Sequence, residues 1–357
     1  MISEIKKEDF RKLARYLDEG MEHPRLRNLF LELTDSCNLC CAHCGSGCSA
    51  ANGTFLETAA VMRTLREVAD RCDPSDVRIC ITGGEPMLHP DLCAIIRRAK
   101  ELGFTVGLTT NGTLIDEAAA RRLTGAGLDS VAISLDGLPQ SHDRFRNSGG
   151  SWQAAVEGIR NLKGCGLEPQ VTTVVHRGNL GELDGIYRLL KALEVWSWAV
   201  IGVDPIGRAR EKDDLLLTGP ELEQMYTFIR DKRFDPENDM EVTAACSHFQ
   251  GLDFEHETRD FYFQCWAGTR NASITASGDI VACLDIERRP ELVQGSIYTG
   301  SFMEAWESGF QVFRRNRALE SRTCAGCEHA AQCRGDSAHT WDYDRNEPRY
   351  CVKTVSN

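Results

Sequence analysis

Six short apolar runs, each followed by a segment with helical periodicity, limit the possible folds of this chain more than any other feature. The runs end at Thr34, Thr82, Thr110, Leu135, Val175 and Val203. The helical patterns cover 57–71, 94–102, 116–124, 152–163, 181–193 and 220–232. Such alternation indicates successive βα units, because a parallel strand needs a long crossover before its neighbour. The sequence therefore predicts an α/β fold, a partial (β/α)6 barrel resembling a TIM barrel, with ligand chemistry at the C-terminal ends of its strands.

The composition and the periodicity of the sequence change after about residue 235. Cysteine, glycine and aromatic residues become more frequent, helical periodicity fades, and seven of the sixteen cysteines fall between Cys246 and Cys351. At the other end, residues 1–20 have the pattern of a charged amphipathic helix. We therefore expect an N-terminal helical extension over 1–27, a core domain over 28–235, and a small cysteine-rich domain stapled by metal over 236–357.

Metal explains the cysteines better than disulfides do. A chain of 357 residues buries enough apolar surface without disulfides, and it begins with a charged helix in place of an export signal. We therefore expect the protein in the cytoplasm, where clustered cysteines indicate metal. No apolar run approaches the ~20 residues of a membrane span. The 41 Lys and Arg against 53 Asp and Glu include no dense basic patch, so neither nucleic acid nor a membrane is an expected partner.

The loop after the first apolar run carries a C-x3-C-x2-C pattern. In LELTDSCNLCCAHC only Cys37, Cys41 and Cys44 fit this spacing. Three thiolates in so short a loop can bind three irons of a 4Fe–4S cubane and leave the fourth iron open to a ligand. A structural zinc site that uses Cys40 or Cys48 as a fourth thiolate is the alternative.

Together with a GGEP segment after the next run, this loop resembles the radical S-adenosylmethionine (SAM) superfamily. Members of that family cleave SAM reductively to methionine and a 5'-deoxyadenosyl radical, which removes a hydrogen atom from an unactivated C–H bond. The resemblance implies that the GGEP segment receives the amino group of SAM. In this chain the segment is Gly83, Gly84, Glu85 and Pro86.

Two further strand ends fit the same resemblance. The segment with Ser134 and Asp136 is similar to the family's ribose-contacting segment, and Arg146 matches an arginine that pairs with the SAM carboxylate. A guanidinium suits a carboxylate because its fork binds both oxygens. The segment from Thr110 to Gly112 reads equally well as a turn, and no contact is assigned to Arg208.

The C-terminal cysteines resemble the SPASM domain, a module that carries auxiliary iron-sulfur clusters in this superfamily. Cys265, Gly278 and Cys283 match its opening C-x9-15-G-x4-C pattern. The resemblance implies that these two cysteines contribute to one auxiliary 4Fe–4S cluster. It assigns a second such cluster to Cys324, Cys327, Cys333 and Cys351. A zinc ribbon is the alternative for tightly spaced thiolates.

The sequence departs from the family at one position, where Ser337 replaces a cysteine four residues after Cys333. The first auxiliary cluster is therefore short of ligands. Cys246, Asp336 or Ser337 could fill the gap, or one iron could stay open, and we favour Cys246.

The resemblance, which covers residues 28–351, predicts an enzyme that modifies a peptide or protein. SPASM-bearing relatives mostly form crosslinks, epimerise residues or oxidise side chains in ribosomally made peptides. An external one-electron reductant such as flavodoxin or ferredoxin would serve as a partner. Cys48, as a hydrogen donor beside the cysteine loop, and Asp285 are the candidate catalytic residues. Sulfatase-maturing relatives have an aspartate directly after the second cysteine of the opening motif, and Leu284 stands there in this chain, which argues against formylglycine formation.

Two other functions stay open. One is dehydrogenation of a small-molecule alcohol, as in relatives with reduced auxiliary domains. The other is a non-catalytic iron-sulfur electron carrier or sensor, in which the GGEP segment has no role. The fewer than thirty residues before the first strand are too few for a leader-peptide-binding domain at this end, so leader recognition, if any, would come from elsewhere.

Overall fold

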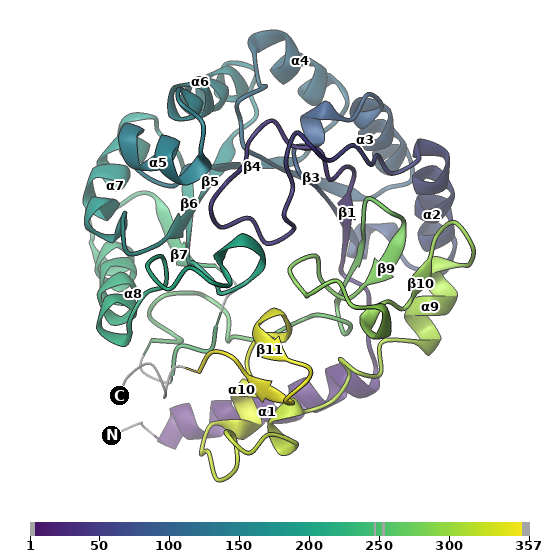
Figure 1. The fold of residues 1–357 in the computed structure, drawn as a ribbon, viewed down its shortest axis with the longest axis vertical. Helices are drawn as coiled ribbons and strands as arrows, with labels where there is room; N and C mark the ends of the chain where they lie inside the picture. Colours follow the sequence, from purple (N-terminus) through teal and green to yellow (C-terminus); the bar gives the residue numbers. More distant parts are fainter. Residues whose placement is uncertain (1–3, 246–247, 252–253, 352–357) are drawn as a thin grey trace.

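The computed structural model describes residues 4–245, 248–251 and 254–351. Ten strands form one curved sheet in the order β10-β9-β8-β1-β2-β3-β4-β5-β6-β7, and helices lie on its outer side (Figure 1). The ten strands are β1 (Asn28–Glu32), β2 (Arg78–Thr82), β3 (Thr105–Thr110), β4 (Ser130–Ser134), β5 (Pro169–Val175), β6 (Ser197–Gly202), β7 (Glu241–Ala244), β8 (Asn271–Ile274), β9 (Asp279–Val281) and β10 (Gly295–Ser296). A separate hairpin pairs β11 (Trp341–Asp342) with β12 (Glu347–Pro348). The expected α/β fold with a partial barrel is confirmed.

The helices pack one apolar face against this sheet. In α3 the buried residues Leu92, Ile95, Ile96 and Ala99 recur at helical spacing, which is the pattern of a helix that covers a core. The remaining helices are α1 (Glu4–Glu22), α2 (Thr58–Arg71), α4 (Glu117–Gly125), α5 (Pro139–Arg146), α6 (Ser151–Gly164), α7 (Leu183–Ala192), α8 (Gly219–Phe234), α9 (Phe302–Ser308) and α10 (Ala330–Cys333), while α3 spans Leu92–Glu101. No helix within the described part of the chain is long and apolar enough to cross a membrane.

The sheet continues beyond the six predicted strands. β7 pairs with β6 and β8 pairs with β1, both in parallel, so residues after 235 lengthen the barrel wall at both edges. The predicted domain boundary at residue 236 falls between α8 and β7. The boundary stays a prediction, but the C-terminal region shares one sheet with the core.

The open side of the barrel, between β7 and β10, is occupied by the C-terminal segment and α1 (Figure 1). Arg334 joins the two, since its guanidinium lies 2.9 Å from the Asp18 carboxylate and donates to the Ala14 carbonyl at 2.8 Å. The N-terminal helix therefore packs on the region that carries the last four cysteines.

Helix α5, over Pro139–Arg146, was not among the helices expected from the sequence. It has only two turns, with Pro139 in the first turn, where a missing amide hydrogen costs little. It ends at Asn147, whose φ of 52° gives the left-handed cap that asparagine tolerates. This short helix buries His142, Phe145 and Arg146, and so carries Arg146 to the inside of the barrel.

Candidate functional site

A cavity of about 470 Å³ lies at the C-terminal ends of the barrel strands. Cys37, Cys41 and Cys44 line one wall, and Cys265 and Cys283 line another. Gly83, Gly84, Ser134 and Arg146 also line it, whereas Glu85, Pro86 and Asp136 do not. The structure therefore brings both predicted groups of cysteines to the same space, although more than 200 residues of sequence separate them.

The cysteine loop is held against the end of β2 by main-chain hydrogen bonds. Gly84 donates to the Thr34 carbonyl at 2.6 Å, and Glu85 donates to the Ser36 carbonyl at 2.9 Å. A Cβ atom at Gly84 would lie 2.1 Å from the Ser36 carbonyl oxygen. Because no side chain fits there, the glycine is required by the approach of the cysteine loop, and not only by the approach of a ligand.

Glu85 supports the loop from below. Its side chain is fully buried and accepts hydrogen bonds from Thr110 Oγ1 (2.7 Å), the Asn111 amide (2.8 Å) and the Met87 amide (3.0 Å). Asn111 in turn donates to Asn38 Oδ1 at 2.9 Å, inside the cysteine loop. The segment from Thr110 to Gly112 therefore connects β3 to the cysteine loop. Glu85 was predicted to contact SAM, and its carboxylate accepts hydrogen bonds from within the fold.

Asp136 and Arg146 form a buried ion pair under the cavity wall. Arg146 Nε lies 2.6 Å from Asp136 Oδ2, and the same carboxylate accepts from the Val174 amide at 2.8 Å. Burial opposes ionisation of Asp136, but the Arg146 charge outweighs it and lowers the pKa of the carboxyl. Arg146 Nη1 lies 3.8 Å from Cys41 Sγ. We therefore assign Asp136, predicted to contact the cofactor, the task of positioning Arg146 at the cavity.

Replacing Asp136 with asparagine should lower the free energy of unfolding by about 3–5 kcal/mol, because it leaves a buried guanidinium without its charge partner. Urea unfolding of the metal-free protein measures the change. The matched control is Glu117→Gln, which breaks the exposed pair with Arg121 and should cost at most about 1 kcal/mol. Equal effects of the two variants would contradict the buried pair.

Arg208 anchors the other side of the cysteine loop, a contact that the sequence analysis did not assign. Its Nε donates to the Cys41 carbonyl at 2.7 Å, and its two terminal nitrogens each lie 3.0 Å from the Cys48 carbonyl. Gly207, with φ of 50°, fits here because a Cβ atom would lie 2.3 Å from the Cys44 carbonyl oxygen. The sequence feature that could have indicated this contact is the segment Ile206-Gly207-Arg208, shortly after the last predicted strand.

The aromatic environment of the loop is a stack of three rings. His43 lies on Phe145 with ring centroids 4.2 Å apart, and Phe145 lies on His176 at 4.0 Å. Burial lowers the pKa of His43 to about 3, so its imidazole is neutral. The stack therefore holds His43, and with it the cysteine loop, against α5 and the end of β5.

The thiols of the loop suit a metal cluster. Burial raises the pKa of Cys37 to about 11 and also raises that of Cys41, so their thiolates need a nearby positive group such as iron. A hydrogen bond from the Cys48 thiol lowers the pKa of Cys44 to about 6. Cys48 lines the cavity and is buried, whereas Cys40 is exposed and does not line it.

The residues of the first auxiliary group line the same cavity. Cys265 accepts a hydrogen bond from the Ala338 amide at 3.3 Å, and Ser337 and His339 line the cavity beside it. Asp285 lines the cavity next to Gly45 of the cysteine loop. Cys246, the favoured additional ligand, lies outside the described residues.

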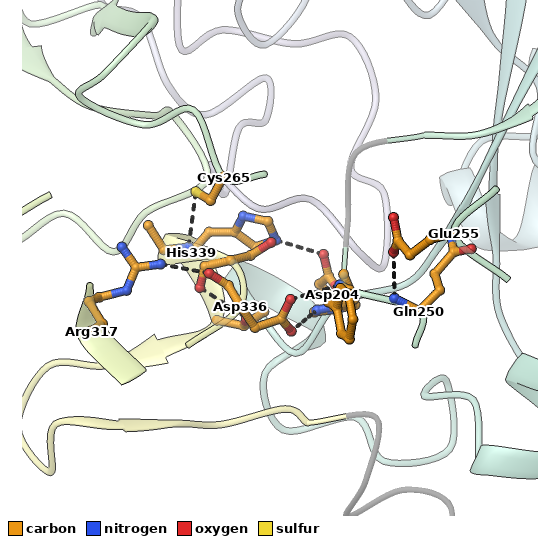
Figure 2. Close-up of polar contacts among 12 residues, drawn as sticks. Asp204, Gln250, Glu255, Cys265, Arg317, Asp336 and His339 are labelled. Carbon is orange, nitrogen blue, oxygen red and sulfur yellow. Dashed lines mark hydrogen bonds and ion pairs between the residues drawn. The ribbon is translucent and has the colours of Figure 1, made fainter. Parts of the chain in front are cut away.

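Asp336, one of the alternatives named for this cluster, has its carboxylate in other contacts. Its Oδ2 lies 2.6 Å from His248 Nδ1, and its Oδ1 accepts from the Phe249 amide at 2.9 Å (Figure 2). It borders the second cysteine cavity and not the first. Asp336 was one of the alternatives for completing the first auxiliary cluster, and in the structure both of its carboxylate oxygens are already paired.

A buried charge network joins the barrel to the C-terminal region. His248 lies between Asp336 and Asp204, with Nε2 2.5 Å from Asp204 Oδ1. His339 Nε2 lies 2.8 Å from Asp204 Oδ2 (Figure 2). Burial alone would lower the pKa of His248, but the two carboxylates raise it to about 10. The charged His248 therefore compensates two buried carboxylates. Apart from the position of Asp204 just after a predicted strand, no local sequence pattern indicates this network.

The second auxiliary group also surrounds a cavity, of about 80 Å³. It is lined by Cys324, Cys327, Cys333 and Cys351, together with Phe249, His329 and Tyr350. No disulfide joins any two cysteines within the described ranges. Over 4–245, 248–251 and 254–351, no three His, Cys, Asp or Glu side chains converge closely enough to hold a single metal ion, so the fit to iron-sulfur clusters rests on thiols that line cavities.

Known proteins resemble the chain over most of its length. A sequence profile of the radical SAM superfamily matches residues 31–190, and one of an iron-sulfur cluster-binding domain, SPASM, matches residues 265–328. The AdoMet-dependent heme synthase of Methanosarcina barkeri is 29% identical over 92% of this chain and 96% of its own length. The mycofactocin maturase MftC of Mycolicibacterium smegmatis is 28% identical over 91% of this chain and 80% of its own.

The fold resembles that of SuiB from Streptococcus suis. SuiB bound to S-adenosylmethionine superposes with a TM-score of 0.75 at 16% identity, covering 96% of this chain and 80% of SuiB. SuiB bound to its precursor peptide SuiA gives the same TM-score, with coverage of 96% and 79%.

Proposed function

Because the chain belongs to the radical SAM superfamily and carries a C-terminal SPASM iron-sulfur domain, we propose that it oxidises a peptide substrate between two cysteine-lined walls. When bound, SAM and the catalytic cluster supply a 5'-deoxyadenosyl radical, and the auxiliary clusters supply one-electron acceptors. The observation that carries this proposal is the shared cavity, since Cys41 and Cys283 line the same space. A substrate in it would lie between the radical source and the auxiliary group.

The residues of the chain hold and shield this site. Arg146 and the main chain at Gly83 and Gly84 border the position that the family gives to the methionine part of SAM. Two residues of the cysteine loop itself line the cavity, namely Leu39, which packs with the loop thiols, and His43, which stacks on Phe145. They would exclude water from the thiols, which lengthens the life of a reactive intermediate. The protein thus contributes placement and a dry cavity.

The charges of the cavity favour a peptide over a highly carboxylated substrate. Its arginines are Arg146, paired with Asp136, and Arg208, whose guanidinium hydrogens face main-chain carbonyls. Neither offers a free fork to a further carboxylate. The relation to a maturase, and the fold shared with a protein solved with its precursor peptide, also support a peptide.

A tetrapyrrole is the second candidate substrate. The observation that favours it is the relation to a heme synthase, which covers 92% of this chain and 96% of that enzyme. The carboxylates of such a substrate would need cationic partners other than Arg146 and Arg208, which already have partners within the protein.

The experiment compares the two substrates in the anaerobically reconstituted enzyme with SAM and dithionite. We expect 5'-deoxyadenosine even without substrate, and several-fold more with a peptide from a library, together with a peptide product that has lost two hydrogen atoms. Stimulation by coproporphyrin alone, with loss of mass from the porphyrin, would favour the tetrapyrrole. If protein that holds its catalytic cluster does not cleave SAM, the assignment as an enzyme is wrong and an electron carrier is favoured.

Asp285 is our candidate acceptor for the proton that the substrate loses on oxidation, because its carboxylate lines the cavity between the two walls. Asp285→Asn should reduce product formation by about 10²–10⁴-fold while 5'-deoxyadenosine still forms. Glu287→Gln is the control, since Glu287 pairs with Arg210 and does not line the cavity. An Asp285→Asn variant that makes product at the normal rate rules out this role.

A further inference from the structure

His339 lies where the ligand set of the first auxiliary cluster is incomplete. It lines the cavity together with Cys265, Cys283 and Ser337. The hydrogen bond from the Ala338 amide to Cys265 Sγ, at 3.3 Å, docks the 337–339 segment directly onto the first thiol (Figure 2). Any cluster held by Cys265 and Cys283 would therefore have His339 beside it.

The ring of His339 is fixed by one strong contact. Its Nε2 lies 2.8 Å from Asp204 Oδ2, and an ionised carboxylate only accepts hydrogen bonds, so Nε2 carries the proton. Asp204 is itself held, because its other oxygen lies 2.5 Å from His248 Nε2. Within the part of the chain that the structure describes, Nδ1 of His339 has no hydrogen-bond partner. In the neutral ring, Nδ1 therefore carries an unshared lone pair on the side away from Asp204.

This arrangement is the one that proteins use to prepare a histidine for a metal. A ligating imidazole donates its second N–H to a carboxylate, which fixes the tautomer and raises the basicity of the ligand. Iron-sulfur clusters accept imidazole in place of thiolate, as in Rieske centres. Ser337 stands where the family has a cysteine, and both carboxylate oxygens of Asp336 already face His248 and Phe249. The competing ligands are Cys246, which lies outside the described residues, and Asp285, which lines the same cavity.

We propose that His339 Nδ1 is a non-cysteine ligand of the auxiliary iron-sulfur cluster at Cys265 and Cys283, with Asp204 as the residue that positions it. The assignment depends on the auxiliary cluster and is independent of the substrate. It gives this cluster a neutral ligand where most relatives have a thiolate, and a neutral ligand raises the reduction potential. The cluster would then accept an electron more readily.

The direct test is pulsed EPR on tag-free, full-length protein, reconstituted anaerobically and reduced with dithionite in the absence of SAM. We expect one auxiliary cluster to show strong coupling to a nitrogen, and we expect that coupling to change when the protein is grown with [15N]histidine. Wild-type protein without any histidine coupling overturns the proposal. So does an iron content of about eight per chain in place of about twelve, because it removes the cluster itself.

Variants identify the residue. His339→Ala should lose the nitrogen coupling, and His339→Cys should keep the cluster, lose the coupling and lower its reduction potential. Ser337→Ala is the matched control and should retain both coupling and potential. Coupling that persists in His339→Ala, or a cluster lost in Ser337→Ala but kept in His339→Ala, overturns the assignment. If His339→Ala does not fold, the wild-type isotope experiment and His339→Cys decide.

Discussion

Cys41→Ala is expected to abolish SAM cleavage, with at least about a thousandfold less 5'-deoxyadenosine, which equals roughly 4 kcal/mol in the barrier. The physical reason is ligand count. Three thiolates hold three irons and leave the fourth for SAM, so the loss of one thiolate leaves two points of attachment. Cys41 Sγ also lies 3.8 Å from Nη1 of the Arg146 guanidinium. Iron content should fall by about four per chain.

The neighbouring cysteine provides the control. Cys40 is exposed and does not line the cavity, so Cys40→Ala should keep both iron and SAM cleavage. Cys327→Ala removes a thiol of the second auxiliary cavity and should spare at least uncoupled SAM cleavage. Undiminished 5'-deoxyadenosine in Cys41→Ala would refute the ligand assignment. Loss of cleavage in Cys40→Ala would revive the alternative in which Cys40 is a fourth ligand of zinc.

Gly84→Ala is expected to have the second largest effect, a loss of the catalytic cluster in a protein that still folds. The added methyl group would meet the Ser36 carbonyl oxygen at 2.1 Å and the Cys37 Cβ at 3.0 Å. Both neighbours belong to the cysteine loop, and a backbone oxygen cannot move without breaking its hydrogen bond from Glu85. The loop would therefore separate from β2, and Cys37 would leave its position.

Iron analysis and SAM cleavage measure this change. We expect about four irons fewer per chain and no 5'-deoxyadenosine, while circular dichroism stays close to that of the wild type. Gly149→Ala is the matched control, because a Cβ atom there has no neighbour within 4 Å. A Gly84→Ala protein that keeps all its iron would show that the loop can yield, and the packing argument would fail.

The parts of the fold that could be predicted are those with a local signal. The six strands β1 to β6 follow from apolar runs, and the longer helices follow from periodicity, because both patterns reflect which face of an element is buried. Helix α5 was missed because its two turns, PQSHDRFR, are too short and too polar for the period to show. Strands β7 and β8, with four residues each, were missed for the same reason.

The sequence by itself determined the cysteine spacings, and with them which thiols can share a cluster, since a short loop limits how far apart its ligands can lie. Only the tertiary structure decided what surrounds those thiols. It paired Asp136 with Arg146, brought Arg208 onto the cysteine loop, and set His339 beside Cys265. These contacts join segments up to 167 residues apart, so no local pattern reveals them. A buried carboxylate can bind a cofactor or pair with another residue of the fold, and its position in the sequence is the same in both cases.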